Sequence, residues 1–359
     1  MDLQKAAGEI LHDAVASGLE HGIQCAVWRD GRKMADVCAG VRVPDGKPVT
    51  EDTLFPVFSA GKGVTATVIH LLAEQGKCGY QMPYSELWPA FGYGARRLVT
   101  LEYVLSHRSG MHNMPQVYTP GEIADWDGMC EKIASMQPEF EPGSRVKYQP
   151  VTFSWLAGEF AARAGEKLFR DLACESVLCP LGMEGGFYFG VDSEADSRVT
   201  LAVPGREMPR FSMTEDTPCY VPVERIYTYP EIRKCCLPGA GALATANALA
   251  LHYQGILDGF LSGKTLDLAT KPSVPAGSLP KPDPVAQAVF GLGYGLFGPE
   301  NDPGQIFGFN GYGGSTGIAD RKTRTAFALV KTDLHLGDDP TRRKLCDLLG
   351  MDYMPWARK

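Results

Sequence analysis

The sequence predicts an α+β protein in which one antiparallel sheet is built from both ends of the chain. Patterns typical of β-strands occur near the N-terminus and again in the last third, whereas the residues between them show mainly helical periodicity. Flanking helices and a large, mainly helical insertion complete the expected architecture. We place the sheet domain at residues 1–58 and 236–359 and the helical domain at residues 59–235, with a site in the cleft between them.

Composition narrows the class of protein. A chain of 359 residues can bury a large core, and 44% hydrophobic with 21% charged residues is ordinary for a soluble globular protein. The net charge of -7 supplies no basic field for a polyanion, which argues against a nucleic-acid partner. No apolar run approaches the roughly 18 residues of a membrane span, so we expect none. The oligomeric state stays open.

The first element is expected to be an amphipathic helix. The segment MDLQKAAGEILHDAVASGLEHG has no positive region followed by an apolar core, as a signal peptide would. Its apolar side chains instead recur at helical spacing: Ile10, Leu11, Ala14 and Val15. We therefore interpret the segment as part of the fold and expect a cytoplasmic protein.

Cysteine and histidine patterns argue against disulfides and metals. The ten cysteines form no CxxC pair, so we expect buried thiols in a reducing compartment. No HExxH occurs, and His107 and His112 are five apart, off a common helical face. We expect neither a metal nor a cofactor.

Two strands and then a helix follow. The stretch GIQCAVWRDGRKMADVCAGV places two apolar runs around Asp30 and Gly31, a dipeptide suited to a tight hairpin turn. Residues 59–76 predict a helix that Gly76 ends. One face of this helix is apolar: Val64, Val68, Leu71 and Leu72.

The rest of the chain divides into helices and then strands. Helical patterns cover residues 101–107, 122–136, 152–164 and 168–177. Strand signals return, after the Pro-rich loop PSVPAGSLPKPDP, in VFGLGYGLFG, IFGFNGYGGSTGIAD and RTAFALVKT, before a closing helix at 340–350.

A serine and a lysine open the helix predicted from residue 59. Side chains at i and i+3 share a helix face, so Lys62 can reach the Ser59 hydroxyl. The positive end of the helix macrodipole and burial both lower the pKa of a lysine placed there. A neutral lysine is a competent general base, which a serine nucleophile needs at neutral pH.

The SxxK spacing is a weak motif because it occurs three times: Ser59 with Lys62, Ser144 with Lys147, and Ser278 with Lys281. The second pair follows a turn and the third lies in the Pro-rich loop, so neither opens an apolar-periodic helix. The local stretch still leaves open that Ser59 is a helix N-cap and Lys62 a solvated first-turn residue.

A resemblance along most of the chain bears on this choice. The segments that carry it are LFPVFSAGKGVTATVIHLLAEQGK, LVTLEYVLSHRSGM, FEPGSRVKYQPVTFSWLAGE, LPGAGALATANALALH and IFGFNGYGGSTGIADRKTRTAFAL. In this order and spacing, from about residue 22 to 332, the chain resembles the beta-lactamase-related serine hydrolases. These include class C beta-lactamases, penicillin-binding DD-peptidases and beta-lactamase-like esterases and acyltransferases. The resemblance implies a beta-lactamase/transpeptidase-like fold.

Carried onto this sequence, the resemblance implies that Ser59 is the acylated nucleophile and Lys62 its activating partner. Tyr148 matches the tyrosine of the second motif, whose phenol shuttles protons with the lysine. We expect the environments of Lys62 and Tyr148 to bring their pKa values toward each other. Without the resemblance, Tyr148 would be interpreted as a core aromatic. His107 is interpreted as a structural loop residue with or without it.

The third motif matches Phe309, Asn310 and Gly311 on a late strand. The resemblance implies that the backbone amides of Ser59 and Tyr312 hold the oxyanion. Glycines in this strand would let a substrate approach the backbone. Substrate binding is therefore expected at four positions: Phe309, Gly311, Gly313 and Gln149.

Two positions depart from the family pattern. Pro150 stands where a polar residue, often asparagine, usually follows the tyrosine, and proline offers no side-chain hydrogen bond. Phe309 stands where a lysine or histidine usually anchors a substrate carboxylate. Losing such a bond should cost on the order of 10- to 100-fold in turnover of penicillins or D-Ala peptides. A phenyl ring instead favours an apolar acyl or alcohol group.

A second serine offers a different interpretation. GGSTG at 313–317 is a literal GxSxG, and Asp333 and His335 follow Ser315 in the order of an α/β-hydrolase. Such an elbow lies in mid-sheet, and the residues left after Gly317 are too few for the rest of that fold.

We therefore expect a serine hydrolase that acts through an acyl-enzyme, a carboxylesterase or acyltransferase on a small or apolar ester rather than a beta-lactamase or DD-peptidase. The alternatives are a beta-lactamase or DD-peptidase, or a catalytically weakened scaffold with a binding or assembly role. No cofactor is implied, and the expected partner is a small-molecule ester.

Overall fold

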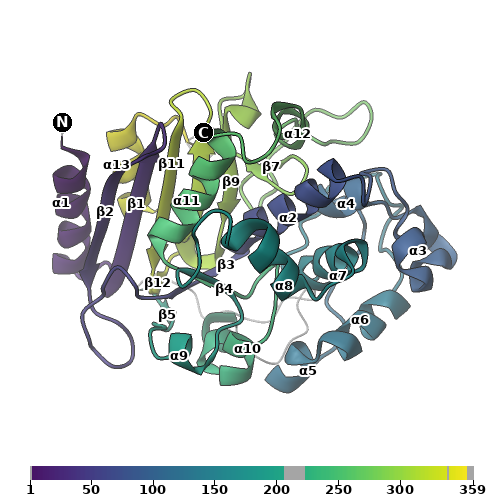
Figure 1. Ribbon diagram of the computed structural model, residues 1–359, viewed down its shortest axis with the longest axis horizontal. Helices are drawn as coiled ribbons and strands as arrows, with labels where there is room; N and C mark the ends of the chain where they lie inside the picture. Colours follow the sequence, from purple (N-terminus) through teal and green to yellow (C-terminus); the bar gives the residue numbers. More distant parts are fainter. Residues whose placement is uncertain (1, 206–222, 338, 354–359) are drawn as a thin grey trace.

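A seven-stranded antiparallel sheet joins the two ends of the chain in the computed structural model, which describes residues 2–205, 223–337 and 339–353 (Figure 1). The strands lie in the order β2, β1, β11, β10, β9, β8 and β7. Their bounds are Arg32–Gly40, Gly22–Arg29, Thr325–Lys331, Thr316–Asp320, Ile306–Asn310, Gly295–Leu296 and Val289–Phe290, in that order. The N-terminal hairpin thus pairs with the C-terminal strands, and the predicted α+β class is confirmed.

The hairpin between β1 and β2 turns at the predicted dipeptide. Asp30 and Gly31 both have positive φ, 49° and 72°. Two consecutive residues in this conformation form the turn whose twist matches that of the flanking strands. The turn brings Arg29 opposite Arg32 and fixes the register of the hairpin.

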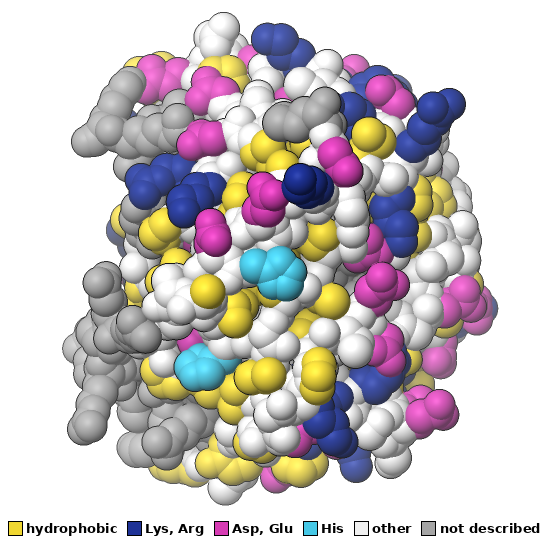
Figure 2. Space-filling view, turned by 90° about the vertical axis from the view of Figure 1, so that its left-hand side faces the viewer, with side chains coloured by type: hydrophobic (Ala, Val, Ile, Leu, Met, Phe, Trp, Pro, Cys, Tyr) yellow, Lys and Arg dark blue, Asp and Glu magenta, His cyan; other side chains and the backbone are white. Residues whose placement is uncertain are grey.

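Helices cover both faces of this sheet. On one face lie α1, Leu3–Ala16, and α13, Pro340–Leu349, which also pack on each other; on the other lies α11, Ala246–Leu257. Alternate side chains of β1 explain this arrangement, because Cys25 and Val27 join the core with α1 whereas Ala26 joins the core with α11. Basic and acidic side chains are interspersed over the face of the molecule that Figure 2 shows.

The helical layer is built around α2, Lys62–Glu74, which packs against α7, Phe153–Gly165. The other helices are α3 Tyr84–Leu87, α4 Leu101–Leu105, α5 Pro120–Ala124, α6 Trp126–Ser135, α8 Phe169–Ala173, α9 Ser193–Asp196, α10 Pro230–Lys234 and α12 Gly263–Ala269. The helices predicted at 59–76, 101–107, 122–136, 152–164 and 340–350 are all present, with bounds that differ by a few residues or, at 122–136, as two short helices.

Two small sheets link the layers. β3 Phe55–Phe58, β6 Ala242–Ala244 and β4 Phe187–Phe189 form one, in the order β3, β6, β4; β12 Asp333–Leu334 and β5 Val203–Pro204 form the other. The sequence did not predict them, because strands of two to four residues are too short to show alternation. It also missed α11 and α12. The domain boundaries at 58 and 236 stay a prediction.

Among the described residues, no helix is both long and apolar enough to cross a membrane. The nine cysteines in these residues are free thiols, and Cys219 lies outside them.

Candidate active site

Ser59 is presented by a strained connection between β3 and α2. Phe58, the last residue of β3, has φ 47° and ψ -128°, a conformation that costs a non-glycine residue roughly 1 to 3 kcal/mol. Its buried ring packs edge-on against Tyr227 and Tyr312, with centroids 4.8 and 5.7 Å away. The chain therefore turns sharply at Phe58, and Ser59 opens the short 3₁₀ helix η1, Ser59–Gly61, that leads into α2.

The side chains of Lys62 and Tyr148 meet at the Ser59 hydroxyl. Lys62 Nζ lies 2.9 Å from Ser59 Oγ, and the Tyr148 hydroxyl donates to the same Oγ at 2.8 Å. Ser59 is 9% exposed, whereas Lys62 is completely buried. The structure thus brings together the three side chains predicted to be catalytic, and Lys62 is not a solvated residue.

Neutral oxygens surround the Lys62 amine. Besides Ser59 Oγ, its partners are the backbone carbonyls of Pro150, at 2.7 Å, and Gly239. Burial lowers the pKa of Lys62 well below its usual 10.5. The neutral amine has two N–H donors and one lone pair. When both donors bind the carbonyls, the lone pair faces the Ser59 hydroxyl, which is the orientation of a base ready to take its proton.

The pKa of Tyr148 shifts in the opposite direction. Burial raises the pKa of its phenol above the usual 10, and the hydrogen bond to Ser59 only partly offsets this. The expectation that the two pKa values approach each other is wrong: Lys62 moves down and Tyr148 moves up. Both shifts have one cause, because burial disfavours each charged form. The shifts therefore favour the neutral amine and the neutral phenol.

Phe309 belongs to an aromatic stack behind this triad. Its ring is 2% exposed and stacks on Tyr148 and Phe290, with centroids 6.2 and 6.3 Å away. Lys62 Nζ lies 5.6 Å from its centre. Phe309 therefore packs against Lys62 inside the protein, and any effect on substrate choice acts from there.

Other parts of the protein occupy the space beside the glycines of the third motif. A Cβ at Gly311 would overlap the carbonyl oxygen of Val57 in β3, and one at Gly313 would overlap Leu334 in β12. Close packing of the backbone is enough to explain why both positions are glycine. The predicted substrate contacts of Gly311 and Gly313 stay a prediction.

Gln149 is turned into the protein. It is completely buried, and its side-chain carbonyl accepts from the Ser109 hydroxyl at 3.1 Å. Its backbone N–H donates to His107 Nδ1 at 3.3 Å. His107 packs edge-on against Tyr148, with centroids 4.9 Å apart, and burial lowers the pKa of its imidazole well below 6.5. Gln149 and His107 hold the loop under Tyr148, in line with the structural role expected of His107.

The other candidate serines lie elsewhere. Ser144 Oγ donates to the carbonyl of Glu141 in a turn. Ser315 is 2% exposed between η7, Tyr312–Gly314, and β10. Its proposed partners are engaged with other groups: Asp333 with His21 and Thr332, and His335 with Glu20. The α/β-hydrolase interpretation is therefore wrong.

Two contributors to the site are missing from the sequence prediction. The carbonyls of Pro150 and Gly239 orient the Lys62 amine, although Pro150 was expected only to remove a side-chain contact. Gly239 lies in the quoted segment LPGAGAL, and its N–H binds Ser154 Oγ at 3.0 Å. Every residue type has a backbone carbonyl, so the sequence does not mark which carbonyl binds Lys62. Only the place of Gly239 in a segment that carries the family resemblance could have indicated it.

Comparisons with known proteins agree with this geometry. A sequence model of the family described as Beta-lactamase matches residues 9–350. The chain is 31% identical over 334 residues to Esterase/beta-lactamase LipL of Mycobacterium tuberculosis, which covers 86% of this chain and 76% of that protein. It is also 29% identical over 198 residues to Esterase EstB of Burkholderia gladioli, covering 50% of this chain and 48% of that protein.

Solved structures extend the likeness to the whole fold. A family VIII carboxylesterase superimposes with a TM-score of 0.85 at 26% identity, covering 97% of this chain and 96% of that one. A penicillin-binding protein homologue from Caulobacter crescentus gives 0.82 at 27% identity, with 100% and 98% covered. With nearly its full length matched in sequence and in fold, the chain belongs to the beta-lactamase family and is a serine hydrolase of that family.

Proposed function

We propose that the protein is a carboxylesterase that transfers the acyl group of a small or apolar ester to Ser59. One observation carries this proposal: the Ser59 hydroxyl lies between a tyrosine hydroxyl and a lysine amine whose pKa burial lowers. A serine in this setting has a base for its proton and a donor beside it, which is the arrangement of an activated nucleophile.

In the proposed reaction, Ser59 Oγ forms a bond to the ester carbonyl carbon while its proton passes to Lys62 Nζ. The backbone N–H groups of Ser59 and Tyr312 stabilise the oxyanion. Collapse breaks the ester C–O bond, and a proton returns to the leaving alcohol through Tyr148. Water, or a second alcohol, then attacks the acyl-enzyme with the same groups acting in reverse.

Two residues next to the triad, Phe309 and Pro150, favour esters over charged amides. Phe309 places a ring where the family usually has a cation for a substrate carboxylate, and Pro150 replaces the usual polar residue. The names of similar proteins point the same way, since family VIII carboxylesterase, Esterase EstB and Esterase/beta-lactamase LipL are among them. A beta-lactamase is the second candidate, which the last of these names supports.

A substrate comparison tests the proposal. We would measure kcat/KM of the purified protein for p-nitrophenyl acetate, butyrate and octanoate and for nitrocefin, with Ser59→Ala as the matched control. We expect ester turnover that Ser59→Ala abolishes, and nitrocefin hydrolysis slower by a factor of about 10 to 100, the value of one charge-assisted hydrogen bond. Nitrocefin turnover that equals ester turnover would favour a beta-lactamase. Ester turnover unchanged in Ser59→Ala would sink both candidates.

A further inference from the structure

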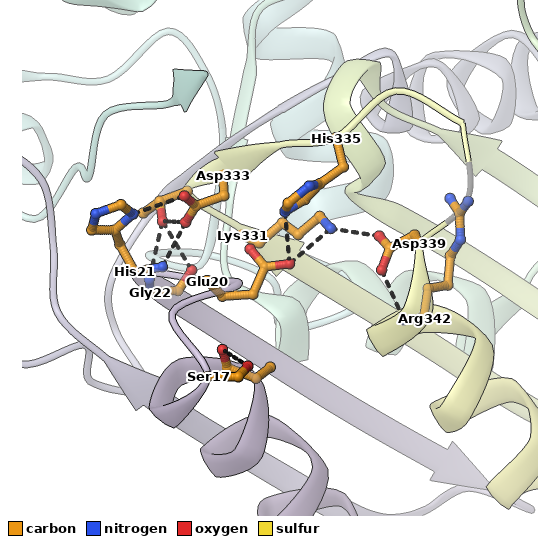
Figure 3. A network of polar contacts seen from close by, with 11 residues as sticks. Ser17, Glu20, His21, Gly22, Lys331, Asp333, His335, Asp339 and Arg342 are labelled. Carbon is orange, nitrogen blue, oxygen red and sulfur yellow. Dashed lines mark hydrogen bonds and ion pairs between the residues drawn. The ribbon is translucent and has the colours of Figure 1, made fainter. Parts of the chain in front are cut away.

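A second buried lysine lies outside the triad, in a cluster of charged side chains that Figure 3 shows. Lys331 ends β11 and forms ion pairs with Glu20, at 3.0 Å, and Asp339, at 2.5 Å. The three side chains are 1 to 2% exposed. Removing one partner of such a buried ion pair strongly destabilises the folded protein, because the other charge is left uncompensated.

This cluster joins three separate parts of the chain. Glu20 lies between α1 and β1, Lys331 ends β11, and Asp339 precedes α13 and accepts from the backbone N–H of Arg342 at 3.0 Å. His335 completes it, with Nε2 3.2 Å from Glu20 Oε1. Burial opposes the charged form of Asp339, but Lys331 and then Arg342 more than offset this and lower its pKa to about 2.

The cluster also touches the turn of the third motif. Gly314 has φ 111°, and a Cβ there would lie 2.7 Å from Lys331 Cε and 2.8 Å from Asp339 Oδ2. One residue earlier, the carbonyl of Gly313 accepts from the backbone N–H of His335 at 2.9 Å. The turn therefore rests directly on the Lys331 side chain and on the segment between Lys331 and Asp339.

On its other side the same turn meets the strand that presents Ser59. The backbone at Gly311 packs so closely on the carbonyl of Val57, two residues before Ser59, that no Cβ fits between them. Tyr312 lies inside this turn, and its ring contacts that of Phe58. A displacement of the turn on its Lys331 side would thus move the Tyr312 backbone relative to Ser59.

We propose that Lys331, held by Glu20 and Asp339, is a positioning residue that sets the backbone amide of Tyr312 for oxyanion binding. The inference rests on the proposed function, because it assigns Lys331 to the acylation of Ser59. The ammonium fixes the turn through packing on Gly314, and the two carboxylates fix the ammonium. Lys331 contacts neither the nucleophile nor the base.

The test is Lys331→Met, with kcat and KM for a p-nitrophenyl ester measured per active site titrated with a fluorophosphonate. We expect kcat to fall about tenfold, less than the roughly 10²- to 10³-fold loss of an entire oxyanion donor. KM and the acid limb of the pH profile should stay the same, since Lys331 contacts neither Ser59 nor Lys62. Lys331→Arg, which keeps the charge, should recover part of the lost kcat.

Two further variants separate positioning from stability. Asp339→Asn keeps a good N-cap for α13 and removes one charge beside Gly314, so it should fold even if Lys331→Met does not, and its kcat should fall several-fold. Asp196→Asn breaks the ion pair with Arg233, 2.6 Å long in another part of the molecule, and should lower Tm without changing kcat. Unchanged kcat per titrated site in Lys331→Met, or in Asp339→Asn if only that variant folds, would overturn the inference.

The labelling rate keeps this outcome distinct from failure of the proposed function. If wild-type Ser59 is not labelled, both the proposed function and the positioning role fail. If wild-type Ser59 is labelled and Lys331→Met is labelled equally fast, with equal kcat, only the positioning role fails. Slower labelling in Lys331→Met than in Asp196→Asn supports it.

Discussion

Lys62 and Lys331 are both buried, yet their partners differ completely. Lys62 binds a hydroxyl and two backbone carbonyls, all of them neutral. Lys331 binds two carboxylates. The first environment disfavours the ammonium form, whereas the second compensates its charge.

The partners of a buried lysine, together with its burial, decide what the lysine can do. Without a carboxylate beside it, Lys62 loses its proton readily and can serve as a base. Between two carboxylates, Lys331 is suited to hold separate segments of the chain together. The first lysine contacts the nucleophile, and the second packs beside Gly314.

The largest expected effect is that of Lys62→Met on turnover. Removing the base should lower kcat/KM for an ester by about 10²-fold or more.

The stability of Lys62→Met should change in the direction opposite to its activity. Because the folded-state pKa of Lys62 lies below the unfolded value of about 10.4, the unfolded state binds more protons between these values and is favoured at pH 7. Replacing Lys62 by methionine removes this cost, so Tm should stay the same or rise.

Lys281→Met is the matched control, since Lys281 completes another SxxK pair and is exposed. Its turnover should stay within about twofold of the wild type, as for an ordinary surface substitution. A similar loss of activity in both variants, or a large drop in Tm in Lys62→Met alone, would contradict the contrast drawn between the two lysines.

The next effect concerns the other partner of Ser59. Tyr148→Phe keeps the ring stacked on Phe290 but removes the hydroxyl that donates to Ser59 Oγ. Turnover should fall by about 10²-fold, the usual contribution of a proton-transfer group, while KM and Tm change little. Steady-state kinetics with thermal melting checks this, and wild-type turnover in the variant would leave Lys62 as the sole group that handles the proton.

A smaller and graded effect is expected from pH. The neutral form of Lys62 is the base, so kcat/KM should rise as pH increases through its lowered pKa and level off well below pH 10. Because burial raises the pKa of Tyr148 above 10, no basic limb should follow below that pH. A profile measured from pH 5 to 10 tests both signs. Activity that appears only near pH 10 would show that Lys62 has an ordinary pKa.

Much of this site could be predicted from the sequence because it depends on local spacing. The position of Lys62 three residues after Ser59, at the start of an apolar-periodic helix, predicts their contact. Tyr148 lies 89 residues from Ser59, so local patterns could not place it, and only the family resemblance did. The hairpin at Asp30 and Gly31 was predictable for the same local reason.

The remainder depends on tertiary contacts that leave no local pattern. Which atom fills the space beside Gly311 or Gly314 is decided by strands distant in sequence, so the sequence could not show how closely the backbone packs there. The helix α11 was missed because it is buried on most of its surface and lacks a clear polar face. The direction of the Tyr148 pKa shift likewise follows from burial that the sequence does not reveal.

The most direct test of the central claim is to label the purified protein with a fluorophosphonate and to map the adduct by peptide mass spectrometry. We predict an adduct on Ser59 and none on Ser144 or Ser315. Labelling should slow by about 10²-fold in Lys62→Met, where the base is missing. Folded protein without an adduct on Ser59, or with an adduct on Ser315 instead, would contradict the account.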